Sequence, residues 1–410
     1  MYRMNLGFTT RRVREGAASI LVPKLDRAEG EHLDHALSKA PVFYNPIMRL
    51  NRDTAVLTLG VHQGRLNRPL VVCEPMCGSG VRGMRLALEV AGVAGVVLSD
   101  LNPRAVRLAE ENAALNGVSD IVRARLMEAN LLLSLHDRPG HRFDYLDLDP
   151  YGSPAPYLDA AVRACRNGGM IGLTATDMAP LCGVYPKACL RKYGGQPLRT
   201  GYCHEIALRL VAGALVRAAA RHEVAARPVF SYAADHYVRL YAVLERGARM
   251  ADRCMEEMGY LLHCVRCLNR KPVGMRELRE VGECDVCGSR LFVGGPLWLG
   301  ELADASFCDE MLAMSESSAL SSDRRLIRII RLVRGEVGLS PSFYGIDALC
   351  SRLRVASLPT GEVLSAIRDA GFEATRTHFD ERGVKTDASI TELEKVLKGV
   401  AERRGKGHVP

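Results

Sequence analysis

The stretch LDLDPYGSP, residues 146–154, presents three chemically different groups in succession: Asp149, Pro150 and Tyr151. Together they suit methylation of an exocyclic amine on a nucleobase, whose nitrogen is a poor nucleophile because its lone pair is delocalised into the ring. A carboxylate that accepts an N–H bond favours the pyramidal nitrogen and can take its proton. The carbonyl of Pro150 can accept the second N–H, and the Tyr151 ring can stack on a flipped-out base.

A glycine-rich loop is the second motif whose residues could bind a ligand. CEPMCGSGVRG, residues 73–83, contains Gly78-x-Gly80-x-x-Gly83 between a predicted strand and a predicted helix. Glycines allow a tight turn and a close ligand approach, and the start of the helix offers free N–H groups. Asp100 ends the next predicted strand about twenty residues further on, where a carboxylate can bind both ribose hydroxyls. The combination predicts a site for an adenosine-containing cofactor.

The loop alone does not choose the cofactor, because a glycine loop followed by an acid also describes NAD enzymes. Glu74 precedes the loop, where a carboxylate suits a ligand with an ammonium and a sulfonium group but repels a pyrophosphate. Glu128 and Ala129 follow the third predicted strand, where an acidic and a small residue can meet the adenine edge. Both details favour S-adenosylmethionine (AdoMet), and an NAD-dependent oxidoreductase remains the alternative from another class.

Four of the thirteen cysteines have the spacing of a metal site. Cys264-x-x-Cys267 and Cys284-x-x-Cys287 are separated by sixteen residues, which is a zinc pattern. Four thiolates close a tetrahedral site, so we expect a structural Zn²⁺ rather than a catalytic one. The alternative is four free buried thiols. The start of the chain has no secretory signal, which predicts a cytoplasmic protein in which disulfides are rare.

The elements that must position these residues alternate regularly after residue 70. Such alternation predicts βαβ units and a Rossmann-like, doubly wound parallel sheet. With the AdoMet motifs above, we interpret this α/β fold as that of a class I AdoMet methyltransferase. The predicted strands are 70–75, 94–100, 121–128, 143–149, 170–177, 227–235 and 236–246. The predicted helices are 81–92, 103–117, 154–169 and about 204–221.

Length and composition predict two domains without a membrane anchor. A chain of 410 residues is too long for one ordinary core, and 48% hydrophobic with 25% charged residues is typical of a globular protein. We predict a catalytic domain with an N-terminal lead-in over 1–250, and a C-terminal α+β domain with the zinc site over 251–410. The chain contains no run of about 18 apolar residues, so no membrane span is predicted. No obligate protein partner is inferred. The net charge of +8 suits an anionic partner without proving one.

An arginine-rich segment, DRRLIRIIRLVRG at 323–335, is predicted to be an amphipathic helix. Arg324, Arg328 and Arg331 fall on one face. The apolar face is formed by Leu326, Ile327, Ile330 and Val333. Two interpretations stay open: an ordinary solvated face, or contacts with nucleic-acid phosphates.

Several stretches resemble the tRNA (guanine-26-N2)-dimethyltransferase family. DPYGSP is similar to the DP[FY]GSP signature of that family and, more distantly, to the [DN]-P-P-[YF] signature of amino-methyltransferases. Three further stretches match: EG at 15–16 with VPK at 22–24, FYNPIMRLNRD at 43–53, and EPMCGSGVRG at 74–83. The resemblance covers most of the chain, although Ile47 stands where a basic residue is expected.

The resemblance implies a specific function. The reaction would convert guanine 26 of tRNA to N2-methyl- and then N2,N2-dimethylguanine, with Asp149 catalytic and the C-terminal domain helping to bind tRNA. The implied AdoMet site is drawn from Arg49, Arg82, Asp100, Glu128 and Ala129; read from the residues alone, the two arginines could equally be surface residues. The alternatives are another nucleobase or amide amino-methyltransferase, the oxidoreductase, and a zinc-containing nucleic-acid-binding module without catalysis.

Overall fold

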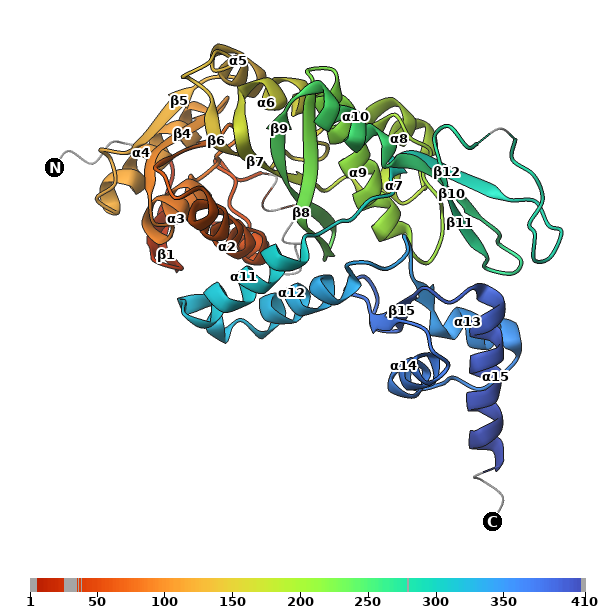
Figure 1. Cartoon of the computed structure of the whole chain (residues 1–410). Helices are drawn as coiled ribbons and strands as arrows, with labels where there is room; N and C mark the ends of the chain where they lie inside the picture. The colour runs from red at the N-terminus through yellow and green to blue at the C-terminus, as the bar shows by residue number, and fades with distance from the viewer. Residues whose placement is uncertain (1–5, 26–34, 36, 38, 279, 407–410) are drawn as a thin grey trace. The chain divides into compact units, whose positions relative to one another are not determined.

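A seven-stranded sheet is the largest element of the fold. The computed structural model describes residues 6–25, 35, 37, 39–278 and 280–406. The sheet order is β5-β4-β3-β6-β7-β9-β8, which Figure 1 follows from the orange strands to the green ones. The strands are β3 (Leu70–Glu74), β4 (Val93–Asp100), β5 (Val122–Leu126), β6 (Phe143–Leu148), β7 (Cys165–Ala175), β8 (Val224–Ala234) and β9 (Tyr237–Arg246).

The strand order creates a switch point between β3 and β6. β3 pairs in parallel with β4 on one side and with β6 on the other, and β4–β5 and β6–β7 are parallel as well. Two residues join β8 to β9, a link that only an antiparallel hairpin permits. Open sheets of this kind bind ligands beyond the carboxyl ends of the strands, where the order reverses. The predicted α/β class is confirmed.

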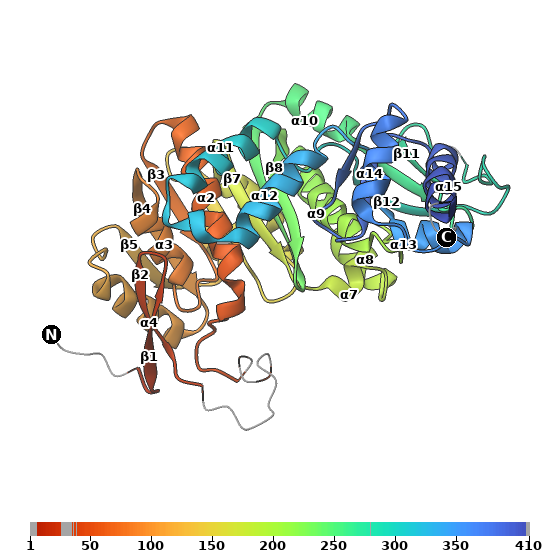
Figure 2. The ribbon, with the colours of Figure 1, turned by 90° about the horizontal axis from the view of Figure 1, so that it is seen from below.

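Helices connect the strands of the large sheet. They are α2 (Arg49–Leu66), α3 (Val81–Glu89), α4 (Pro103–Leu115), α5 (Ala129–Leu135), α6 (Leu158–Ala164), α7 (Met178–Leu181), α8 (Pro186–Tyr193), α9 (Cys203–Ala220) and α10 (Ala248–Glu256). Of these, α3, α4, α6 and α9 correspond to the four that the sequence predicts. The predicted helix over 154–169 is wrong at its end, because the chain is already extended at Cys165, which pairs with Phe143. Helices α2 and α3 lie side by side in both views (Figure 1, Figure 2).

Smaller elements precede and follow the large sheet. The N-terminal hairpin pairs β1 (Thr10–Glu15) with β2 (Ala18–Pro23). A three-stranded sheet has the order β11-β10-β12, formed by β10 (Met258–His263), β11 (Arg270–Gly274) and β12 (Phe292–Trp298). Then follow α11 (Ala305–Glu316), α12 (Arg324–Glu336), β13 (Tyr344–Gly345), α13 (Ile346–Leu353), α14 (Thr360–Asp369), β14 (Ala374–Arg376), β15 (Gly383–Thr386) and α15 (Ile390–Lys406).

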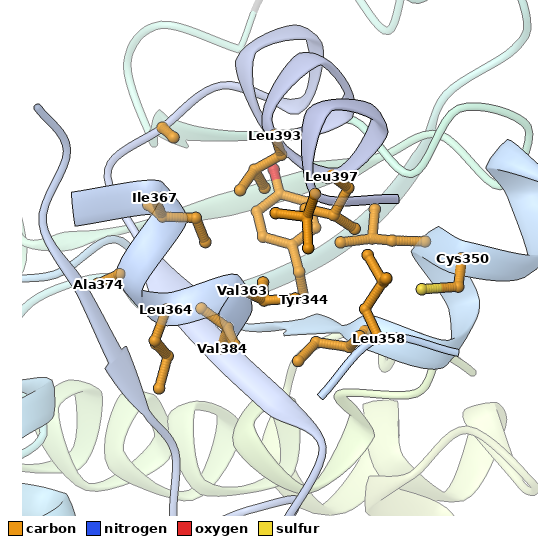
Figure 3. Close-up of a cluster of buried hydrophobic side chains, with 14 of the residues drawn as sticks. Tyr344, Cys350, Leu358, Val363, Leu364, Ile367, Ala374, Val384, Leu393 and Leu397 are labelled. Carbon is orange, nitrogen blue, oxygen red and sulfur yellow. The ribbon is translucent and has the colours of Figure 1, made fainter. Parts of the chain in front are cut away.

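The C-terminal elements have an apolar core of their own. Tyr344, Ile367 and Leu397 are buried in it, with side chains from α13, α14, α15 and the β13-β15-β14 sheet around them (Figure 3). Since this cluster draws on both helices and strands, the predicted C-terminal α+β character is borne out by these elements.

The chain divides into two compact units. The first comprises Met1–Thr174, Tyr241–Arg246 and Glu310–Ile327, and the second comprises Ala175–Leu240, Gly247–Asp309 and Arg328–Pro410. The predicted domain boundary near residue 250 stays a prediction. None of the described helices combines the length and the apolar content that crossing a bilayer requires.

Candidate active site

The glycine loop connects β3 to α3 in a conformation that needs glycine. Gly78 and Gly80 have φ values of 52° and 72°, in the left-handed region. A Cβ on Gly78 would also lie 2.9 Å from the carbonyl oxygen of Phe43, so no side chain fits there. The loop is therefore tight, with Ser79 and Gly80 buried and Gly78 partly exposed.

Asp100, at the end of β4, holds this loop in place. One carboxylate oxygen accepts the Gly78 N–H at 2.9 Å, and the other accepts the Asn102 N–H at 2.9 Å. A carboxylate offers about four lone-pair positions, so two remain for ligand hydroxyls. The structure thus brings two sequence-predicted cofactor residues, Gly78 and Asp100, into direct contact.

Arg82, in the first turn of α3, is the centre of a buried charge cluster. Its side chain is 3% exposed, and Nε lies 3.3 Å from both Glu74 Oε1 and Asp147 Oδ1. Nη1 donates to Asn51 Oδ1 at 2.7 Å, and Nη2 pairs with Asp149 Oδ2. These five residues, which we call the Arg82 cluster, come from α2, β3, α3 and the end of β6. They join three of the predicted site residues: Glu74, Arg82 and Asp149.

The charges of the Arg82 cluster are uneven, because one arginine faces three carboxylates. Burial raises the pKa of Glu74 to about 8; Arg82 and the Gly83 N–H oppose this, whereas Asp147 and Asp149 add to it. Glu74 is therefore mostly protonated at pH 7, although it accepts the Gly83 N–H at 3.0 Å. A ligand that brings positive charge would relieve the excess of carboxylates.

The residues after β6 differ sharply in exposure. The Asp149 side chain is 20% exposed, and Pro150 is buried. Tyr151 is 91% exposed, which is unusual for an aromatic residue at the end of a buried strand. Asp149 is thus anchored on Arg82 yet reachable, and the Tyr151 ring is free to stack on a planar partner.

The remaining predicted cofactor residues lie outside the Arg82 cluster. Arg49 begins α2 with a side chain that is 59% exposed, and its Nε lies 3.5 Å from Asp53. Glu128 caps the N-terminus of α5, where its carboxylate accepts the Leu131 N–H at 2.9 Å. Ala129 is buried beside it. Glu128 therefore has a structural task in addition to any ligand contact.

A second buried cluster lies one helical turn further along α3 and was not predicted. Arg85 is fully buried; its guanidinium contacts Asp53 at 2.5 Å, Glu89 at 2.8 Å and Glu15 at 3.2 Å. Arg52 also binds Glu15, at 2.5 Å. Burial would raise the pKa of Glu15, but hydrogen bonding and charge from Arg52, with Arg85, lower it overall. We call these residues, with Arg49, the Arg85 cluster.

Asn51 and Asp147 were not predicted as site residues, although both contact Arg82. Asp147 stands out in the alternating LDLD pattern, and the Tyr145 hydroxyl donates to it at 2.6 Å. Asn51 lies in the NRD stretch of α2 and also donates to the Thr174 hydroxyl at 3.1 Å. Their positions in two quoted motifs were the available signal; their shared partner could not be read from the sequence.

The four predicted cysteine ligands come together. Their sulfur atoms lie within 4.8 Å of one another; Cys264–Cys287 and Cys267–Cys284 are each 3.4 Å apart. Both Cys-x-x-Cys turns are built alike, since the residue after each pair donates its N–H to the carbonyl of the first cysteine. This residue is Leu268 with φ 61° in one turn and Gly288 with φ 66° in the other. The donor set and the spacing fit a tetrahedral metal ion.

The arginine-rich segment forms α12, with its arginines largely exposed. Leu326, Ile330 and Val333 are buried as predicted, but Ile327 is half-buried and Ile329 takes its place on the apolar face. Two of the arginines have acidic partners: Arg328 lies 3.2 Å from Glu381, and Arg334 lies 2.9 Å from Asp309. The helix is therefore basic, but part of its charge is neutralised within the protein.

Comparison with known proteins decides the family. The N2,N2-dimethylguanosine tRNA methyltransferase family matches residues 16–398. A tRNA (guanine(26)-N(2))-dimethyltransferase of Methanothermobacter thermautotrophicus is 40% identical over 390 residues, covering 95% of this chain and 98% of that protein. One from Methanopyrus kandleri is 41% identical over 400 residues, covering 97% and 98%.

A solved structure extends the likeness to three dimensions. Trm1 from Pyrococcus horikoshii, in complex with S-adenosyl-L-methionine, matches with a TM-score of 0.81 and 34% identity, covering 94% of this chain and 99% of that one. This chain belongs to the N2,N2-dimethylguanosine tRNA methyltransferase family. The predicted enzyme, a tRNA (guanine-26-N2)-dimethyltransferase, and the class I fold are thereby confirmed.

Proposed function

We propose that this enzyme methylates N2 of guanine 26 in tRNA with Asp149 as the proton acceptor and AdoMet as the donor. The observation that carries the proposal is Asp149 itself, fixed on Arg82 at the sheet's switch point and followed by an exposed Tyr151. AdoMet carries its methyl group on a sulfonium sulfur, which leaves as a neutral thioether and is a good leaving group. Catalysis therefore consists chiefly of positioning the amine for in-line attack.

The residues around the glycine loop suit a site for AdoMet. Asp100 has two lone-pair positions left for ribose hydroxyls, and Gly78 beside it is partly exposed. The excess of carboxylates around Arg82 suits the ammonium and sulfonium charges of AdoMet. Glu128 and Ala129 would lie at the adenine edge, and Arg49 is exposed enough to reach the carboxylate of the methionine moiety.

The two carboxylate oxygens of Asp149 have different roles in this proposal. Its Oδ2 is held by Arg82, which leaves Oδ1 to accept an N–H of the guanine amino group. As the N–CH₃ bond forms and the S–CH₃ bond breaks, the amine becomes cationic and its proton passes to Asp149. The Pro150 carbonyl would accept the second N–H, and Tyr151 would stack on the base. One N–H remains after the first transfer, which permits the second.

We further propose that Cys264, Cys267, Cys284 and Cys287 hold a structural Zn²⁺ in a C-terminal domain, 251–410, which helps to bind tRNA. Four thiolates with no open position suit a structural ion. Metal analysis of protein purified without chelators should find one zinc per chain. Replacing Cys264 by Ser should weaken tRNA binding more than AdoMet binding, whereas loss of both or of neither would contradict the assignment.

One experiment tests the reaction directly. The protein is incubated with methyl-labelled AdoMet and unmodified tRNA, and the nucleosides are separated after digestion. Labelled N2-methyl- and N2,N2-dimethylguanosine are expected, and they should vanish when guanine 26 is replaced by adenine. Label in another nucleoside, or none, would refute the proposal. An oxidoreductase would instead change NADH fluorescence and ignore AdoMet.

A further inference from the structure

The segment between Asp177 and Glu205 has a one-sided charge pattern. Residues 178–204 contain no acidic residue. They contain four basic side chains with permanent charge: Lys187, Arg191, Lys192 and Arg199. Since the whole chain has 47 acidic and 55 basic residues, such a stretch is more basic than its surroundings. Helix α8 lies in the middle of it.

Helix α8 buries one side and exposes the basic one. Cys189 and Tyr193 are buried, whereas Lys187, Leu190 and Arg191 are exposed. The exposed residues are spaced by three and four positions, so they share one face of the helix. The two residues just before the helix, Val184 and Tyr185, are 50% and 61% exposed, and Leu190 is 51% exposed. An aromatic ring and two aliphatic side chains thus lie among the cations.

Three of the four cations have no acidic partner among the described residues, and the fourth, Lys192, is paired with Asp177. The Asp177 carboxylate is already engaged, because Lys192 Nζ lies 2.8 Å from one oxygen and the Tyr193 hydroxyl donates to the other at 2.5 Å. In the part of the chain that the structure describes, Lys187, Arg191 and Arg199 have no acidic partner. Their charge is therefore available to a ligand.

The segment is also held rigidly. Arg217 donates to the Tyr193 carbonyl at the end of α8, and to the Pro296 carbonyl at 3.2 Å. Gln196 exchanges two backbone hydrogen bonds with Gly295, at 2.7 and 2.8 Å. A surface fixed in this way loses little conformational entropy when it binds a partner.

We propose that Val184, Tyr185, Lys187, Leu190, Arg191 and Arg199, the α8 surface, bind the substrate tRNA. The inference rests on the proposed function, because that function supplies the polyanion. The arginine and lysine side chains would contact phosphates, and Tyr185 would stack on an unpaired base or a terminal base pair. The exposed ring distinguishes this surface from α12, which has no aromatic residue and in which Arg328 and Arg334 are paired with acids.

The test compares two double variants of equal charge in tRNA-binding titrations between about 50 and 200 mM salt. Lys187→Gln with Arg191→Gln should weaken binding of unmodified tRNA about ten- to a hundredfold. It should also make the slope of log K against log salt shallower by about 1.8, because each lost phosphate contact removes about 0.9. Arg107→Gln with Arg138→Gln removes the same charge from exposed positions elsewhere and should change neither quantity appreciably.

The ring is tested separately. Tyr185→Ala should weaken tRNA binding by about five- to a hundredfold, whereas Tyr185→Phe keeps the stacking surface and should bind within a few-fold of the wild type. In all variants the AdoMet affinity and the unfolding midpoint should be unchanged, and in turnover assays KM for tRNA should rise while kcat stays near that of the wild type.

The outcomes separate this inference from the proposed function. If the wild type binds tRNA but forms no methylguanosine, the proposed function fails, and the salt slopes still decide about the α8 surface. If the Lys187→Gln, Arg191→Gln variant keeps the wild-type slope and KM, the α8 surface does not bind tRNA. A change in oligomeric state with unchanged tRNA binding would make it a protein interface instead, and would equally overturn the inference.

Discussion

Two arginines of α3, three residues apart, lie in buried clusters that differ in their balance of charge. Arg82 and Arg85 are both buried, and each contacts three carboxylates. Around Arg85 the positive charge is shared: Arg52 also binds Glu15, and Arg49 lies 3.5 Å from Asp53. Around Arg82 a single guanidinium meets Glu74, Asp147 and Asp149. The same building blocks thus form a charge-balanced cluster in one place and an unbalanced one in the other.

The Arg85 cluster and the Arg82 cluster also differ in the pKa values of their carboxylates and in their exposure to solvent. In the balanced cluster the pKa of Glu15 is lowered despite its burial, mainly through Arg52, whereas burial raises the pKa of Asp53 against the charge of Arg85. In the unbalanced cluster the pKa of Glu74 is raised to about 8, chiefly by burial. Asp149 is 20% exposed beside the open ring of Tyr151. An unsatisfied excess of negative charge next to an accessible carboxylate indicates a site for a cationic ligand.

The largest expected effect is on the chemical step. Asp149→Asn keeps the size of the side chain but cannot take the amine proton, so the single-turnover rate should fall about 10²- to 10⁴-fold. The matched variant in the other cluster, Glu89→Gln, should transfer methyl groups within a few-fold of the wild type. Rapid-quench assays with saturating AdoMet and tRNA measure both. A rate for Asp149→Asn close to wild type would reduce Asp149 to a positioning role.

The second prediction compares the replacement of Arg85 with the replacement of Arg82. Arg85→Gln leaves buried carboxylates without their partner, which should lower the free energy of unfolding by about 3–5 kcal/mol. Arg82→Gln should cost less stability, because Glu74 is already mostly protonated, but it should slow transfer by releasing Asp149. Denaturant unfolding and single-turnover rates, measured on both variants, provide the comparison. Equal stability losses with equal rates would show that the clusters do not differ in task.

A smaller effect is expected at Asp100, which lies outside both arginine clusters. Asp100→Ala removes the proposed ribose contact and the bond that holds Gly78, and a hydrogen bond to a charged group is worth about 1.5–3 kcal/mol. AdoMet affinity should therefore fall about ten- to a hundredfold in calorimetry. The control Asp120→Ala, an exposed acid after α4, should bind normally. Unchanged affinity in Asp100→Ala would contradict the cofactor site.

The smallest expected effect is a pH dependence from Glu74. The free protein holds a proton on Glu74 below about pH 8, and a bound cation favours the ionised form, so binding releases this proton. AdoMet affinity should then rise about tenfold between pH 7 and pH 9, and this rise should be absent in Glu74→Gln. Calorimetry in buffers of different ionisation enthalpy would detect the proton. A flat affinity profile in the wild type would rule out the linkage.

The same group gives a stability prediction of definite sign. The pKa of Glu74 in the folded state is about 8, above its ordinary value of 4.5, so the folded protein binds a proton that the unfolded chain releases. The contribution of Glu74 to stability should therefore decrease as the pH rises from about 4.5 to about 8. The difference in unfolding free energy between the wild type and Glu74→Gln, measured across this range, reports that decrease.

The sequence by itself determined the order of elements and the local motifs. Strands and helices alternate because apolar runs and helical periods alternate, and these are local patterns. The turn from Gly78 to Gly80 requires φ values that favour glycine, so its residues identify it. The spacing of Cys264, Cys267, Cys284 and Cys287 fixes two similar turns, which is why the sulfur cluster could be predicted.

Tertiary structure decided which groups meet. Arg82 is joined by residues 31 positions before it and 67 after it, Asn51 and Asp149, and no local pattern encodes such a pairing. The early start of β7 at Cys165 depends on its partner Phe143 in the neighbouring strand. The balance of charge around Arg82 and Arg85 likewise depends on β1, α2, β3 and β6 converging on α3. Burial and distance set these energies, and both exist only once the chain is folded.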